Sequence, residues 1–345
     1  MLADFQTTSS ESDARSWTRK LSAYHRPSLR RGIYELAVTA IPFALTWMLM
    51  LIALRFEQIW LYLLLILPAS GLLIRLFMIQ HDCGHGSFFR NGRGNDWTGR
   101  LIAIVTLTPY DYWRRCHAIH HATSGNLDRR GVGDIETLTV REYAACSPWG
   151  RLRYRLYRNP IVMFGIGPAF YFIFKNRLPF GFMRKGRTPW ISTMATNLAI
   201  AVVIAFMMWL VGIGLFLIIQ LPIVLLGTAG GVWLFYVQHQ FEDTHWAEDK
   251  DWNMHKAALN GSSHYDLHPI LRWFTANIGV HHVHHLSSRI PYYRLQDVLR
   301  DYPELRDSGR LTLRQSLGCV RLVLWDEERR RLISFKEMHR LRYAG

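Results

Sequence analysis

Residues 188–241 read TPWISTMATNLAIAVVIAFMMWLVGIGLFLIIQLPIVLLGTAGGVWLFYVQHQF, and none of them is Asp, Glu, Lys or Arg. A helix needs about 20 apolar residues to cross the roughly 30 Å hydrocarbon core of a membrane. The stretch is therefore too long for one membrane-spanning helix and about right for two. We expect the two helices to join near Gln220, Leu221 and Pro222, because proline commonly marks a turn.

A second pair of uncharged runs lies nearer the N-terminus. Residues 36–54 form one run and residues 58–74 form the other, with a very short turn at Arg55, Phe56 and Glu57 between them. Arg75 ends the second run by its charge, but the helix itself can continue past it. The sequence thus predicts four membrane spans in two hairpins, at about residues 36–54, 58–79, 193–216 and 221–238.

Four spans return the chain to the side on which it starts. The N-terminal arm, residues 80–187 and residues 239–345 then share one face, and they hold nearly all of the Lys and Arg. The positive-inside rule places such segments in the cytoplasm. We therefore expect a single domain over residues 1–345: an all-α integral membrane protein of four transmembrane helices, with a cytosolic helical cap formed by residues 80–187 and 239–345.

Charge and cysteine content narrow the classes of partner and compartment. The formal net charge is +15, which suits a membrane surface with anionic lipids or an acidic carrier protein, rather than nucleic acid. The first thirty-one residues are basic and have no apolar core, so we expect no cleavable signal peptide. The four cysteines are scattered and form no CxxC pair, so they predict neither a disulfide framework nor a cysteine-ligated metal.

Two segments of the expected cap have a pattern of their own. Ile161–Phe174 is apolar, but it is short and contains Gly and Pro, so we expect it to lie at the membrane interface or to re-enter the membrane rather than to span it. Arg310–Arg342 is charged, and we expect it to be helical with a solvated face.

The histidines carry the chemical information. The chain has sixteen, and eleven fall in four short clusters. His81 and His85 are four residues apart where the second span would leave the membrane, so one continuing helix would place both rings on one face. His117, His120 and His121 form an HxxHH pattern, whose offsets of three and four again favour one helix face.

A third cluster repeats the HxxHH pattern with His281, His284 and His285. One such pattern occurs on many ordinary helices, where a surface or core histidine is the simpler interpretation. Three clusters on the same predicted side of the membrane are hard to explain in that way. Because imidazole is a common ligand of iron, copper, zinc and nickel, we expect these eight histidines to bind two metal ions.

The fourth cluster is less regular. His239 extends the fourth span as His81 extends the second, so we expect it to be a ninth ligand. His245 lies six residues further on and would face elsewhere on a continuing helix, so the sequence leaves its role open. His282 lies off the face of the third cluster and is not expected to bind. Five more histidines are interpreted as ordinary polar residues: His25, His255, His264, His268 and His339.

Nearby polar residues are candidates to orient the rings. A metal-bound imidazole usually donates its other ring proton to a carboxylate, a carbonyl or water. Asp82, Asp128, Asp134 and Glu242 are close in sequence to the clusters. Asn277, four residues before His281, would either bind a metal-bound water or cap a helix.

A nitrogen-only pair of metal ions at a membrane boundary favours redox chemistry. Hydrolytic zinc sites use about three protein ligands and keep one position open, so eight or nine histidines exceed that need. Two irons can share the electrons needed to split O2 and oxidise an unactivated methylene. An apolar tunnel would then select the bond by shape and depth.

Three segments carry a resemblance to a known family: HDCGH at residues 81–85, WRRCHAIHHATSGNLD at 113–128 and NIGVHHVHHLSSRIPYYRL at 277–295. They resemble the three histidine boxes of the membrane fatty acid desaturases, and the segments around them resemble the bacterial acyl-lipid branch. The similarity runs from about Gln80 to Leu295 and includes QHQFEDTHW at residues 238–246.

The resemblance implies a fold of four spans with a cytosolic cap in a bacterial inner membrane. It further implies two irons bound by the eight box histidines, O2 as oxidant, and removal of two hydrogens from a fatty acyl chain to leave a cis double bond. The sequence has neither an HPGG haem motif nor a GxGxxG flavin fingerprint. We therefore expect the electrons to come from another protein, such as a ferredoxin.

Two alternatives remain open at this point. A lipid hydroxylase or ketolase would use the same scaffold and histidine boxes but insert oxygen. A metal transporter would need polar residues in the middle of the membrane, and the four predicted spans have almost none.

Overall fold

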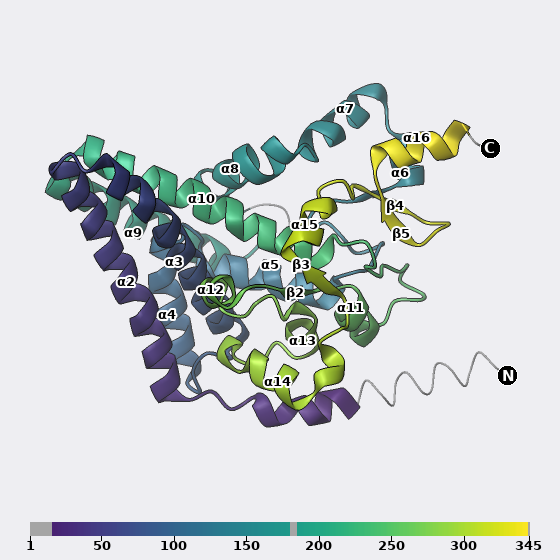
Figure 1. The fold of residues 1–345 in the computed structure, drawn as a ribbon, viewed down its shortest axis with the longest axis horizontal. Coiled ribbons are helices and arrows are strands. Elements are labelled where there is room, and N and C mark those ends of the chain that lie inside the picture. The colour runs from purple at the N-terminus through teal and green to yellow at the C-terminus, as the bar shows by residue number, and fades with distance from the viewer. Residues whose placement is uncertain (1–15, 180–184, 344–345) are drawn as a thin grey trace.

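The computed structural model describes residues 16–179 and 185–343, so Arg15 and the rest of the first fifteen residues lie outside the described part. The protein is mostly helical (Figure 1). Among the described residues, four helices are long and apolar enough to cross a membrane. They are α2 (Leu29–Arg55), α3 (Ile59–His85), α9 (Arg187–Val211) and α10 (Ile213–His239). The four helices predicted from the sequence are therefore present.

The two hairpins differ in how well their turns were predicted. The α2–α3 turn lies where expected, and Glu57 there has a φ of +57°. The α9–α10 turn lies at Gly212, with a φ of +91°, so the prediction of a joint near Gln220–Pro222 is wrong. Glycine adopts this conformation at little cost. Pro222 lies inside α10, because apolar membrane helices tolerate a proline that would end many others.

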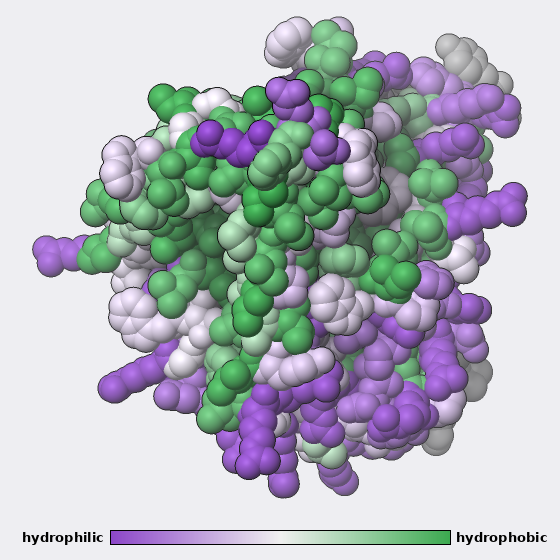
Figure 2. Space-filling model, turned by 60° about the vertical axis from the view of Figure 1, so that its left-hand side comes forward, coloured by the Kyte–Doolittle hydropathy of each residue, from purple (hydrophilic) through white to green (hydrophobic). Residues whose placement is uncertain are grey.

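A broad hydrophobic face covers these helices. Figure 2 shows hydrophobic side chains gathered across it, with hydrophilic ones mainly below and to its right. Leu64, Leu67, Leu198 and Trp209 are among the exposed side chains of the long helices. An exposed apolar surface of this extent is expected where lipid, rather than water, surrounds the protein.

Most of the cap lies beyond the ends of α3 and α10, toward the right of Figure 1, whereas its first helix, α4, lies alongside α3. Its helices are α4 (Gly92–Val105), α5 (Tyr110–Thr123), α6 (Val140–Ala145), α7 (Pro148–Tyr157), α8 (Gly167–Ile173), α11 (Met254–Asn260), α12 (Pro269–Phe274), α13 (His281–Leu286), α14 (Leu295–Asp301), α15 (Leu313–Cys319) and α16 (Phe335–Tyr343). Short 3-10 or π segments are η1 (Ser22–Tyr24), η2 (Val162–Ile166), η3 (Lys175–Arg177), η5 (Tyr292–Arg294) and η6 (Pro303–Leu305). The segment predicted to lie at the membrane interface is η2 and α8, a helical run too short to span.

Within residues 16–179 and 185–343, five short strands join parts of the cap. β1 (Leu138–Thr139), β4 (Leu324–Asp326) and β5 (Arg331–Ile333) form one sheet, parallel between β1 and β4 and antiparallel between β4 and β5. β2 (His264–Asp266) and β3 (Arg310–Thr312) form a parallel pair. The prediction that Arg310–Arg342 is helical is therefore correct for α15 and α16 and wrong for β3, β4 and β5. Short apolar runs that are buried, such as Leu324 and Trp325, favour strands in this part of the chain.

Helix continuation positions the site. α3 does not end at Arg75 but continues to His85, where Gly86 caps it with a φ of +66°. α10 likewise continues to His239. The last turns of both helices thus enter the cap. A buried core that includes Ile79, Tyr110 and Val283 holds the end of α3, and a second core that includes Val237 and Tyr265 holds the end of α10.

Gly279, two residues before α13, lies in tightly packed surroundings. A Cβ atom on Gly279 would lie 2.4 Å from the backbone oxygen of Tyr265, which a flexible side chain cannot relieve. We expect Gly279→Ala to lower the free energy of unfolding by roughly 2 kcal/mol. The control is Gly318→Ala in α15, where a Cβ meets nothing within 4 Å. Thermal unfolding in detergent checks both, and equal unfolding temperatures would contradict the packing.

Candidate metal centre

Nine histidines form two groups at the boundary between the long helices and the cap. The first group is His81, His85, His117, His121 and His284, and the second group is His120, His239, His281 and His285. Within each group the ligand atoms lie within 4.8 Å of one another. All nine histidines that the sequence predicted as metal ligands are therefore brought together, His239 included.

Four helices supply these rings. α3 gives two to the first group, and α10 gives His239 to the second. α5 and α13 each supply both groups: His117 and His121 of α5 belong to the first, whereas His120 belongs to the second. The HxxHH pattern thus serves two sites rather than a single one. Residues four apart share a group, and the residue between them points to the other.

Close contacts between Nε2 atoms define the first group. His117 Nε2 lies 3.1 Å from the Nε2 atoms of His85 and His121, and His121 Nε2 lies 3.2 Å from that of His284. Two nitrogens bound at right angles to one ion at about 2.1 Å would lie about 3.0 Å apart. The spacing therefore matches ligands of one shared ion.

The second group has the same spacing. His239 Nε2 lies 3.1 Å from His120 Nε2 and 3.0 Å from His281 Nε2, and His281 Nε2 lies 3.0 Å from His285 Nε2. A ring nitrogen carries either one proton or a lone pair. One proton on a central Nε2 atom cannot point straight at two neighbours, whereas lone pairs directed at one cation satisfy every ring. The donor set fits a metal ion in each group, and nitrogen ligands suit iron among other metals.

Outward hydrogen bonds hold several rings. The Nδ1 atom of His120 donates to the carboxylate of Asp134, and that of His81 lies 3.1 Å from Asp82 Oδ1. His239 Nδ1 donates to the backbone oxygen of Gly261 over 3.2 Å. A donor bond at Nδ1 leaves the Nε2 lone pair free for a metal. Asp82 and Asp134 are thus placed as the sequence suggested.

The other predicted orienting residues lie elsewhere. Asp128 accepts a hydrogen bond from the backbone of Asp249, and Glu242 is exposed. Asn277 donates to the backbone oxygen of Tyr292 and so holds two loops together. The suggestions of a ring-orienting role for Asp128 and Glu242 are wrong, because Asp128 accepts from a backbone N–H instead and the side chain of Glu242 is exposed.

Two histidines near the clusters belong to neither group. His282 is fully buried, and its Nε2 atom bonds the backbone oxygen of Leu305 over 2.8 Å, which agrees with its predicted exclusion. His245, whose role the sequence left open, lies in the loop after α10 and outside both groups. The helix ends at His239, so the chain has changed direction before it reaches His245.

Aromatic rings around the site were not predicted. Trp113 stacks on His117 with ring centroids 4.6 Å apart and an interplanar angle of 16°. Phe235 lies 5.0 Å from His120 and 5.3 Å from His239 by the same measure. Both aromatics precede a histidine of their own helix by four residues. That spacing, visible in the sequence, was a usable signal, since residues four apart on a helix are neighbours.

Burial keeps the cap histidines neutral. It lowers the pKa of His117, His121, His281, His284 and His285 well below the ordinary 6.5, and neighbouring histidines lower it further. At neutral pH these rings hold no positive charge. Neutral imidazole is the form that binds metal ions.

Comparison with known proteins agrees with the residues of the site. The fatty acid desaturase family matches residues 57–316, a range that contains all nine histidines. A "Fatty acid desaturase" of Bacillus subtilis (strain 168) is 43% identical over 321 residues, which cover 92% of this chain and 90% of that protein.

Two cyanobacterial proteins from Synechocystis are more distant relatives. An "sn-1 acyl-lipid omega-3 desaturase (ferredoxin)" is 30% identical over 64% of this chain and 61% of its own length. An "sn-1 oleoyl-lipid 12-desaturase" is 28% identical over 64% of this chain and 62% of its own length.

Acid should destabilise the metal-free protein through these rings. Below pH 6.5 the unfolded chain gains protons that the folded chain, with its lowered pKa values, does not accept. Stability is therefore full above pH 6.5 and is lost as the pH falls, by up to roughly 1.4 kcal/mol per pH unit for each ring. Thermal unfolding between pH 8 and pH 5 measures this slope. A double variant, His117→Asn with His284→Asn, should show a smaller dependence of the unfolding temperature on pH. An unfolding temperature of the wild type that rises as the pH falls would contradict this explanation.

Proposed function

The chain belongs to the fatty acid desaturase family, and on that premise we propose that it introduces a cis double bond into a fatty acyl chain, with O2 as the oxidant. The family's members are oxidoreductases, and this member is a membrane protein. The observation that carries the proposal is the convergence of nine histidine ring nitrogens into two groups at the ends of α3 and α10.

In this proposal each group holds one iron ion. The first group offers five histidines and the second group four. Iron bound there would supply the activation of O2 that an unactivated methylene requires. The protein's own contribution is to keep the rings neutral, to orient them through Asp82 and Asp134, and to exclude water from the site by burial.

The proposed reaction balances as follows. Two C–H bonds on neighbouring methylenes break, and a C=C bond forms between the two carbons. O2 takes up four electrons, two from the acyl chain and two from an external donor. The two hydrogens and two protons from solvent end in two water molecules.

We assign an acyl-lipid as the substrate. Two relatives are named for acyl-lipid and oleoyl-lipid substrates. Two of the four apolar helices, α3 and α10, lead from the membrane to the histidine groups, so a lipid tail can approach along an apolar surface. An apolar tail offers only its shape and length for recognition, which favours a tunnel between the helices.

The electrons would come from a ferredoxin-like protein. One relative has ferredoxin in its printed name. The net charge of +15 favours association with an acidic protein. The positive-inside rule places the cap, and with it the histidine groups, on the cytoplasmic side of what we propose is a bacterial inner membrane.

Lipid analysis tests the reaction. We expect new unsaturated acyl chains when the wild type is expressed in a host that lacks unsaturated-lipid synthesis, and none with His284→Ala, which removes a ring of the first group. His245→Ala, outside both groups, should retain the wild-type profile. Mass spectrometry of fatty acid methyl esters is the measurement. Hydroxylated or keto chains instead would reassign the protein to oxygen insertion on the same scaffold.

Iron analysis tests the ninth ligand. The purified wild type should contain about two iron ions per chain, and His239→Ala should fall toward about one, because the second group then keeps only three rings. His245→Ala is the matched control and should keep about two. Elemental analysis with the protein concentration gives the ratio. Full iron content in His239→Ala would remove this residue from the ligand set.

A further inference from the structure

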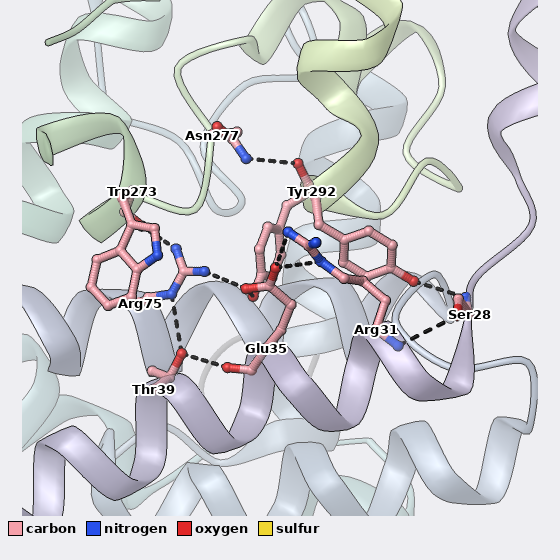
Figure 3. Close-up of polar contacts among 9 residues, drawn as sticks. Ser28, Arg31, Glu35, Thr39, Arg75, Trp273, Asn277 and Tyr292 are labelled. Carbon is pink, nitrogen blue, oxygen red and sulfur yellow. Dashed lines mark hydrogen bonds and ion pairs between the residues drawn. The ribbon is translucent and has the colours of Figure 1, made fainter. Parts of the chain in front are cut away.

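A buried ion pair lies near the histidine groups but outside them. Arg75 of α3 pairs with Glu35 of α2, and their side chains are only 3% and 2% exposed. Figure 3 shows the side chains around this pair. We call Glu35, Thr39, Arg75, Trp273 and Tyr292 the Arg75 cluster.

Every polar group of the Arg75 guanidinium has a partner in the cluster. Its Nε atom donates to Thr39 Oγ1 over 3.1 Å, one terminal nitrogen donates to the backbone oxygen of Trp273, and the other pairs with Glu35 (Figure 3). The guanidinium carbon also lies 4.3 Å from the centre of the Trp273 ring. The fork of Arg75 thus joins α2 to the last turn of α12.

Glu35 extends the connection to the other side of α13. Its carboxylate accepts from the Tyr292 hydroxyl over 3.0 Å, and from Arg31 of the same helix. The backbone N–H of Tyr292 donates to Asp82 Oδ2 over 2.7 Å, and the other oxygen of Asp82 faces His81. One carboxylate therefore touches both the loop after α13 and a ring of the first group.

α13 is held from both sides by these contacts. Trp273 lies eight residues before His281, and Tyr292 lies seven residues after His285. The helix itself has only six residues, and so short a helix has almost no stability of its own. Its position must come from packing and from its flanks, and the Arg75 cluster holds both flanks against α2 and α3.

The position of α13 matters because it supplies both groups. His284 belongs to the first group, whereas His281 and His285 belong to the second. A shift of α13 relative to α3 and α5 would change both sets of distances at once. Stability alone does not explain the ion pair, because a buried ion pair often stabilises a folded protein no more than apolar residues of the same size would.

We propose that the Arg75 cluster is a positioning device, which fixes α13 and so sets the relative placement of the two histidine groups. None of its members touches a reacting atom. The proposal rests on the proposed function for its effect on turnover, but its effect on α13 does not depend on the reaction. A charged residue within an apolar helix, when all of its polar groups are paired, commonly serves the function of a membrane protein rather than its stability.

Arg75→Lys tests the device, because lysine keeps the charge for Glu35 but cannot reach all three partners. Hydrogen exchange of the purified protein should rise about tenfold in residues 273–292 and remain unchanged in α9 and α16. The control is Arg310→Lys, which alters an exposed Arg–Asp pair in the same way. The proposal would be overturned if exchange became faster throughout the protein, or if it did not become faster in residues 273–292.

The iron-loaded protein gives the second readout. In Arg75→Lys we expect iron content close to that of the wild type, a changed Mössbauer spectrum for both ions, and turnover lowered roughly 10- to 100-fold. A wild-type spectrum and wild-type turnover would overturn the positioning role. If the wild type itself makes no unsaturated lipid, the proposed function fails, while hydrogen exchange still decides whether the cluster holds α13.

A second variant covers the case in which Arg75→Lys does not fold. Tyr292→Phe removes only the hydroxyl that donates to Glu35 and leaves the backbone bond to Asp82. It should increase exchange in residues 281–292 and change the iron spectrum in the same sense, to a smaller degree. Tyr143→Phe, a buried tyrosine of α6 whose hydroxyl accepts from Arg155, is the matched control. Equal behaviour of the two tyrosine variants would overturn the proposal.

Discussion

Nine imidazole rings, six of them buried and three half-buried, must keep their ligand atoms within 4.8 Å of one another in each group, and most of the structure serves this constraint. Unpaired lone pairs that face one another in a dry site are unfavourable unless a cation joins them. The histidines therefore cannot hold their own arrangement, and the surrounding helices must impose it. Packed helices, outward Nδ1 bonds and the buried ion pair of Arg75 supply that rigidity together.

The membrane helices determine where the site can lie. α3 and α10 cross the apolar layer and continue until His85 and His239, so the rings lie just where the apolar surface ends. α5 and α13 then pack across these ends, and each gives rings to both groups. A site at this boundary is within reach of a lipid tail on one side and of a soluble electron donor on the other.

Local patterns in the sequence predicted most of the fold and the nine histidines that the structure brings together. Uncharged runs predicted four spans, and helical continuation predicted His239. The predictions that were wrong needed information beyond the local sequence pattern. Pro222 indicated a helix end, but α10 continues through it, and the turn lies at Gly212 instead. The strands β3–β5 depend on pairing with segments far away in sequence. The division of each HxxHH pattern between two groups, and the pairing of Glu35 with Arg75, follow from packing that no single segment contains.

If each histidine group holds its own metal ion, anomalous diffraction or electron microscopy of the iron-loaded protein will locate two iron ions. We expect one iron peak among His81, His85, His117, His121 and His284, and one among His120, His239, His281 and His285. A single peak, or iron bound away from both groups, would contradict this expectation.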